Sequence, residues 1–171
     1  MYKDIKSNCK YALIRVGRLR EVYIAKIIWS MLVIFFYYMS IILITYILGY
    51  IFKNDSYEVI DPNYFKIDTI SLILIVFLLY FMTTMSFIII FFVLTLKIKP
   101  TFVFLIELFI FLASVFSTNK YFLGQQSLII RHTPFSSIYK ITVSESIIVD
   151  LLVIVIFLIV GIIISDKKEI F

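Results

Sequence analysis

Four long apolar runs divide this sequence, and they limit what the chain can fold into more than any other feature. Each is close to the roughly 17–25 residues that a helix needs to cross a bilayer. The runs are Ile27–Phe52, Thr69–Leu96, Phe102–Ser117 and Ile147–Ser165. A soluble domain could not cover the apolar surface of a chain that is 63% hydrophobic. The sequence therefore predicts an all-α polytopic membrane protein, with one membrane domain over residues 1–171 and four transmembrane helices.

The charges between the runs predict how the chain is oriented in the membrane. Lys and Arg residues dominate the segment before the first run, and the short turn Lys97–Pro100 carries only positive charge. The loop 53–68, in contrast, is mainly acidic. Segments rich in Lys and Arg stay on the cytoplasmic side. We therefore expect both termini in the cytoplasm, including residues 1–26, and the segment 118–146 outside.

The segment before the first run has the pattern of an amphipathic helix. Leu13, Val16 and Tyr23 share one arc at helical spacing, whereas Arg15 lies elsewhere. Gly17 weakens a continuous helix, so we expect two short helices, the second merging into the first transmembrane helix. Two interpretations fit this pattern. The segment is an interfacial anchor that fixes the topology, or it is a docking surface for a cytoplasmic partner.

The segment before the last run is predicted to lie on the outer leaflet. Its central part, Tyr121–Ile130, is too apolar for a solvated linker and too short to span the membrane. We expect a short helix or a re-entrant segment there, with Gly124 permitting a turn and Pro134 ending it. His132 has no second His, Cys or carboxylate near it in the sequence, so we interpret it as an interfacial polar residue.

Two carboxylates and a group of hydroxyls lie within the apolar runs. Glu107 is roughly 10 Å into the third run at 1.5 Å per residue, where a charge costs about 2.5–3.5 kcal/mol. It is a candidate for a substrate or proton path, together with Thr83 and Thr84; the alternative is a protonated or hydrogen-bonded packing role. Asp150 is closer to the end of its run, which favours an interfacial position. We expect the two threonines and Ser86 to form interhelical or backbone hydrogen bonds.

Several chemistries are excluded by motifs that the sequence lacks. It contains no Gly-x-x-x-x-Gly-Lys-Ser/Thr loop and no His-Glu-x-x-His pair. The predicted topology puts the single cysteine, Cys9, and the single histidine, His132, on opposite sides, which excludes a Cys–His intramembrane protease. Cys9 is then a free structural thiol. We expect no enzyme activity, cofactor or metal; active transport would draw its energy from a partner or an ion gradient.

Parts of the chain resemble the membrane subunit of ABC-2-type (type V) ATP-binding cassette exporters. The stretch Tyr11–Lys26 looks like the cytoplasmic stretch before the third span of these permeases. The second run with its basic turn is similar to their fourth span, and the segment Phe122–Pro134 matches their outer segment before the final span. Such permeases usually have six spans, and this chain resembles only the last four.

The resemblance implies a permease or accessory subunit of an exporter in a bacterial cytoplasmic membrane. ATP would be bound by a separate cytoplasmic ATPase, and a second permease subunit, identical or full-length, would complete the transporter. The residues that would couple the chain to the ATPase are Arg15, Val16, Arg18, Leu19 and Tyr23. The alternative is a small non-transporting four-span protein, such as a bacteriocin-immunity or regulatory binding subunit.

Overall fold

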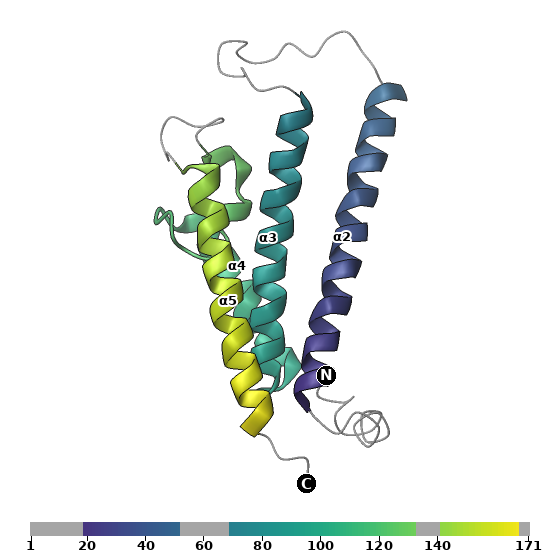
Figure 1. Ribbon diagram of the computed structural model, residues 1–171. Helices are drawn as coiled ribbons and strands as arrows, with labels where there is room; N and C mark the ends of the chain where they lie inside the picture. Colours follow the sequence, from purple (N-terminus) through teal and green to yellow (C-terminus); the bar gives the residue numbers. More distant parts are fainter. Residues whose placement is uncertain (1–18, 52–68, 133–140, 168–171) are drawn as a thin grey trace.

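The computed structural model describes residues 19–51, 69–132 and 141–167, and Figure 1 shows how they are arranged. Within these ranges the regular elements are helices, and the only β-type contact is an isolated bridge between His132 and Ile141. Three of the described helices are long and apolar enough to cross a membrane: α2 (Leu19–Ile51), α3 (Thr69–Thr95) and α5 (Val143–Lys167). The chain is therefore a helical, multi-pass membrane protein, as the apolar runs predicted.

The third apolar run forms the shorter helix α4 (Pro100–Phe116). Proline is favoured at the first helical position, because the N–H that it lacks would have no partner there. The helix has 17 residues, which gives a length of about 25 Å against a hydrocarbon core of about 30 Å. It ends where the Ser117 N–H donates to the Ala113 carbonyl at 3.0 Å.

Helix α3 is central to the bundle and contacts α2, α4 and α5 (Figure 1). The start of α2, the turn between α3 and α4, and the end of α5 lie at the same end of the bundle (Figure 1). Arg20 and Asp166 meet there at 3.9 Å, with both side chains about half exposed. Such an exposed pair contributes little stability, but it shows that the start of α2 and the end of α5 are neighbours. We call this the basic end, after the lysines of the Lys97–Pro100 turn.

The core of the bundle lies between α2, α3 and α5, toward the basic end. Helix α2 contributes Tyr23, Ile27 and Ile34 to this core. Helix α3 contributes Met85, Ile89 and Val93, and partly buried side chains of α5 pack against them. Toward the opposite end α2 and α3 diverge (Figure 1). Most apolar side chains of α2 are exposed along the length of the helix, from Ile28 to Ile51. That pattern is expected for a helix that faces lipid, where packing rather than a hydrophobic drive joins the helices.

The segment between α4 and α5 packs against the carboxyl end of α4, the start of α5 and the middle of α3, near Phe87. It contains two single 3₁₀ turns, η2 (Gln125–Ser127) and η3 (Ile129–Arg131). Of these, η2 contacts α3 and α5. Gly124 precedes the first turn with φ 97°, a left-handed conformation that favours glycine. The predicted turn at Gly124 is confirmed. Two 3₁₀ turns stand where a short helix or a re-entrant segment was expected, and the place of this segment on the outer leaflet stays a prediction. Pro134, which was expected to end it, lies outside the described residues.

Candidate functional site

A buried group of polar side chains joins α5 to α3. Asp150, Thr83 and Ser86 are 0%, 3% and 0% exposed, respectively. Thr83 Oγ1 lies 2.8 Å from Asp150 Oδ2, and Ser86 Oγ lies 3.4 Å from Asp150 Oδ1. We name these three residues the Asp150 cluster. The predicted interfacial position of Asp150 is therefore wrong.

The reason for this correction is the position of Asp150 on its helix. Helix α5 begins at Val143, so Asp150 is about two helical turns from the start. Ser146, Asp150 and Gly161 are buried on the same side of α5, whereas Leu151 and Leu152 are exposed. A carboxylate on the inward side meets α3 and not the headgroups, and α3 supplies hydroxyl partners at that level. The expected hydrogen bonds of Thr83 and Ser86 are confirmed.

Thr84, the neighbour of Thr83, points to a different helix. Its Oγ1 is 2.7 Å from the Tyr38 hydroxyl of α2, which confirms the expected interhelical hydrogen bond. Tyr38 also stacks on Tyr80 of α3, with ring centroids 6.1 Å apart and an interplanar angle of 16°. The two adjacent threonines therefore join α3 to α5 and α2, respectively. Their part in a substrate or proton path stays a prediction.

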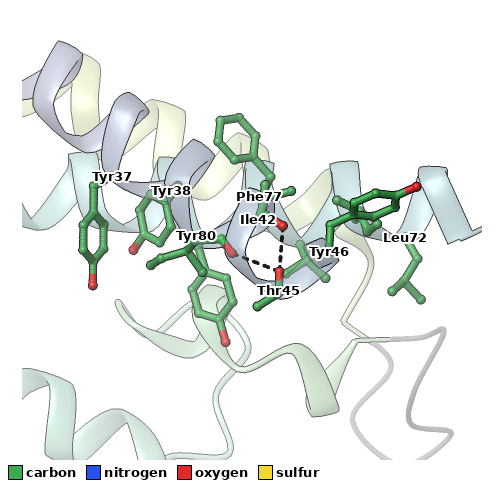
Figure 2. Close-up of a pocket in the computed structure, with 11 residues that line it drawn as sticks. Tyr37, Tyr38, Ile42, Thr45, Tyr46, Leu72, Phe77 and Tyr80 are labelled. Atoms are coloured by element: carbon green, nitrogen blue, oxygen red, sulfur yellow. Dashed lines mark hydrogen bonds between the residues drawn. The ribbon is translucent and has the colours of Figure 1, made fainter. Parts of the chain in front are cut away.

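Beyond Tyr38, the diverging helices α2 and α3 leave a groove of about 590 Å³. Tyr37, Tyr38 and Tyr80 lie together at one end of the view in Figure 2, and Tyr46 and Leu72 lie toward the other. The Thr45 hydroxyl is used within its own helix, because it donates to the carbonyls of Ile41 and Ile42 (Figure 2). The groove is therefore apolar, with phenol hydroxyls as its main polar groups.

Glu107 lies on the inward side of α4, and its carboxylate is away from the Asp150 cluster. Val103, Glu107 and Ser114 recur at i, i+4 and i+11 on the side of α4 that is least exposed. A cavity of about 260 Å³ is lined by Glu107 and apolar side chains, namely Phe87, Phe104, Leu108, Phe111 and Leu112. Glu107 Oε1 is buried and has no hydrogen-bond partner among the described residues. Glu107 was predicted to face helices or a cavity rather than lipid; it lines this open apolar space, and that prediction stays a prediction. The structure does not bring Glu107 to Thr83 or Thr84.

Arg131 and Gln125 cover the carboxyl end of α4. The Arg131 guanidinium donates to the carbonyl of Ser117 at 2.6 Å and to that of Val115, and it also reaches Gln125 Oε1. The amide of Gln125 donates to the carbonyls of Ser114 and Ser117. Carbonyls at a helix end have no partner within the helix, so these side chains supply the missing donors. Neither role was predicted from the sequence; the polar pair Gln125-Gln126 in an apolar stretch was the available signal.

His132 fastens the same segment to α5. Its side chain is fully buried, with Nε2 2.9 Å from Ser146 Oγ and Nδ1 3.2 Å from the Leu128 carbonyl. Burial lowers the pKa of His132 from its ordinary value, because the charged imidazolium is poorly solvated there. A neutral ring that donates from Nδ1 to Leu128 accepts from Ser146 at Nε2. His132 was predicted to be an interfacial polar residue; the structure shows that its side chain is buried against Ser146.

Lys120 and Glu145 form a second link between the segment that follows α4 and helix α5. Lys120 Nζ is 2.9 Å from Glu145 Oε1, and both side chains are about one-third exposed. This hydrogen bond raises the pKa of Lys120. Because the pair is partly exposed, it contributes little to stability. It connects Lys120 to the first turn of α5.

Two of the residues predicted to couple to an ATPase are buried inside the chain. Leu19 is 5% exposed and packs with Leu96 and Ile164, and Tyr23 is 0% exposed. The prediction that these two side chains contact the ATPase directly is therefore corrected, because both face α3 and α5. The other three residues of the predicted set, Arg15, Val16 and Arg18, lie outside the described residues.

Nothing in the described ranges 19–51, 69–132 and 141–167 brings three His, Cys, Asp or Glu side chains together in a way that could hold a metal ion. Comparisons with protein-family models, curated proteins and solved structures found no match.

Proposed function

We propose that this chain is a membrane subunit of an ABC exporter, either a permease or an accessory subunit, that works with a separate cytoplasmic ATPase. It resides in the cytoplasmic membrane of a bacterium and crosses it four times, with α4 as the third span. The basic end of the bundle faces the cytoplasm. A second permease subunit, identical or full-length, completes the transporter. The proposal begins from the sequence resemblance, and one feature of the bundle supports it.

The supporting observation is how the start of α2 contacts the rest of the bundle. Leu19 packs against Leu96 at the end of α3 and Ile164 of α5. One turn later, Tyr23 lies against Gly161 of α5. The residues directly before α2, Arg15–Arg18, are those assigned to the ATPase contact. A displacement at that point would therefore be passed through Leu19 and Tyr23 to two other helices, as coupling requires.

This arrangement changes the roles within the coupling set. Arg15 and Arg18 bind acidic residues of the ATPase, and Val16 supplies apolar contact. Leu19 and Tyr23 act one step later, as positioning residues that transmit the movement inside the bundle. Desolvated charge pairs at an interface are sensitive to the loss of one partner, at about 2–5 kcal/mol. A cation that only anchors the chain to anionic lipid contributes about 1 kcal/mol.

Co-purification of the chain with a cytoplasmic ABC ATPase tests the proposal. Reversing both charges (Arg15→Glu with Arg18→Glu) should release the ATPase and leave the chain in the membrane. The matched control is Lys97→Glu with Lys99→Glu, which makes the same charge change at the same end of the bundle. If the control releases the ATPase equally, the contact is general electrostatic attraction. If the wild-type chain retains no ATPase, the non-transporting binding subunit replaces the exporter proposal.

The topology has its own test in intact cells. Tyr121 lies beyond α4 and is 60% exposed, whereas Ile98 lies in the basic turn and is 37% exposed. A cysteine at position 121 should react with an impermeant thiol reagent from outside, in a chain whose Cys9 is replaced by serine. A cysteine at position 98 should react only after the membrane is opened. The reverse pattern would overturn the assignment of the basic end to the cytoplasm.

A further inference from the structure

When Asp150 is ionised, the two hydroxyl groups of the Asp150 cluster have four hydrogen-bond contacts and only two hydrogens to donate. Thr83 Oγ1 is 2.8 Å from Asp150 Oδ2 and 2.9 Å from the Leu79 carbonyl. Ser86 Oγ is 2.7 Å from the Thr83 carbonyl and 3.4 Å from Asp150 Oδ1. A hydroxyl carries one hydrogen and donates once. Each hydroxyl must therefore choose between a carbonyl and the carboxylate.

A proton on Asp150 removes this conflict. The acid O–H then donates to Thr83 Oγ1, Thr83 donates to the Leu79 carbonyl, and Ser86 donates to the Thr83 carbonyl. Every hydrogen is used once, at oxygen–oxygen separations of 2.7 to 2.9 Å. In the ionised form, both hydroxyls must turn away from the carbonyls. The carboxylate would then receive one short bond and one of 3.4 Å, both from uncharged donors.

The charged and titratable groups of the neighbouring elements have other contacts. Helix α3 contains no Asp, Glu, Lys, Arg or His between residues 71 and 95. On α5, Glu145 pairs with Lys120 and Asp166 with Arg20. In the segment that follows α4, Arg131 binds the end of α4 and His132 binds Ser146.

The remaining titratable side chains near the bundle core also face elsewhere. Glu107 of α4 lines its own cavity, Tyr38 bonds Thr84, and Tyr23 lies beside Gly161. The contacts of the Asp150 carboxyl in the described bundle are thus with hydroxyl groups. An isolated buried carboxylate is strongly disfavoured, and such a group neutralises.

We propose that Asp150 is a proton-binding site that controls the contact between α3 and α5. With the proton bound, the neutral acid donates to Thr83 and the two helices stay packed. When the proton leaves to water, the carboxylate gains a charge that the two hydroxyls do not compensate. The helices then separate enough to admit water to Asp150. This site is independent of the exporter proposal and applies equally to a chain that binds no ATPase.

Infrared spectroscopy of the full chain in lipid nanodiscs tests the protonation state directly. A protonated acid absorbs in the carboxylic C=O region, which is separate from the carboxylate bands. At pH 7 the wild-type spectrum should contain a band that is absent from Asp150→Asn and retained in Glu107→Gln. Thr83→Val removes the acceptor, so the same band should persist and move to higher wavenumber. If wild type and Asp150→Asn are identical in this region, Asp150 is ionised and the proposal is overturned.

Hydrogen exchange tests the second half of the proposal, the control of helix packing. After correction for the intrinsic effect of pH, amides of α3 and α5 near the cluster should exchange faster in wild type as the pH is raised. Asp150→Asn should exchange slowly at every pH, because its amide N–H₂ donates to Thr83 as the neutral acid does. The contrary outcome is a wild-type chain that shows no such acceleration and keeps a clear protonated-acid band at every pH. Asp150 would then stay protonated throughout, and the proposal that it controls helix packing would be overturned.

Discussion

Tyr23 on α2 occupies the space beside Gly161 on α5 that a side chain at position 161 would need. A β-carbon placed at residue 161 would collide with the hydroxyl and ring of Tyr23. The absence of a side chain at Gly161 therefore allows the two helices to approach each other. Gly49 also lies within a transmembrane helix, but a β-carbon there would meet no atom within 4 Å. The two glycines form a natural test pair.

We expect Gly161→Ala to destabilise the bundle and Gly49→Ala to leave its stability unchanged or slightly higher. Overpacking of a tight contact costs about 1–3 kcal/mol, whereas alanine gains about 0.5–1 kcal/mol over glycine in an open helix position. Thermal unfolding of both variants in the same detergent measures the difference. Tyr23→Leu should restore part of the stability lost in Gly161→Ala. Equal melting temperatures for the two glycine variants would contradict the contact.

Arg131→Gln should expose the last turn of α4. The variant loses charged hydrogen bonds to the carbonyls of Val115 and Ser117, and such bonds contribute about 1.5–3 kcal/mol each. Hydrogen exchange of residues 113–117 should therefore become faster, with little change in α2. Lys120→Gln is the matched control, since it removes a cation from the same segment without touching α4. Similar exchange in both variants would mean that Arg131 does not hold the helix end.

Acidification should release the segment that contains His132. Burial lowers the pKa of His132 below its ordinary value of 6.5 in the folded chain. The released segment therefore binds a proton more readily, and the stability of the docked form falls as the pH drops below about 6.5. Limited proteolysis between Asn119 and Arg131, compared at pH 7.5 and pH 5.5, should show faster cleavage at the lower pH. In His132→Gln the pH difference should disappear; its persistence would assign the effect to another group.

Glu107→Leu should stabilise the bundle. Glu107 Oε1 is buried without a hydrogen-bond partner in the described residues, and leaving such a group unsatisfied costs about 1–3 kcal/mol. Asp150→Leu provides the contrast, because the Asp150 carboxyl has partners and its loss should lower the melting temperature. Thermal unfolding of both variants gives the comparison. A lower melting temperature for Glu107→Leu would indicate that its carboxylate has a structural partner.

The positions of the helices were largely predictable, but their ends were less so. The first run was predicted to span Ile27–Phe52, with a short helix after Gly17 merging into it; that merging is confirmed, because α2 runs unbroken from Leu19 to Ile51. Leu19 and Tyr23 extend the helix because α3 and α5 bury them, and hydropathy does not detect a contact that forms only in the bundle. The last helix likewise begins at Val143 and not at Ile147. There, a Glu145 carboxylate that accepts from the Thr142 N–H completes the first turn.

The site residues show the same division between composition and geometry. The hydroxyls of Thr83, Thr84 and Ser86 were expected to form interhelical or backbone bonds, because a polar group in hydrocarbon needs a partner. Their partners were not predictable. Asp150 was expected at the interface from its distance to the end of the run, but the rotation of α5 about its own axis turns it toward α3.

The sequence by itself determined that this is a helical membrane protein, because apolar runs of this length leave helices as the way to satisfy the backbone in lipid. It also determined which helix ends carry positive charge. The tertiary structure decided which polar groups meet: Asp150 with Thr83, Tyr38 with Thr84, and Arg131 with the end of α4. The physical reason is that apolar helices can rotate and slide against one another at little hydrophobic cost in a membrane. Close packing, as at Gly161, and the need to pair buried polar groups then fix their rotation.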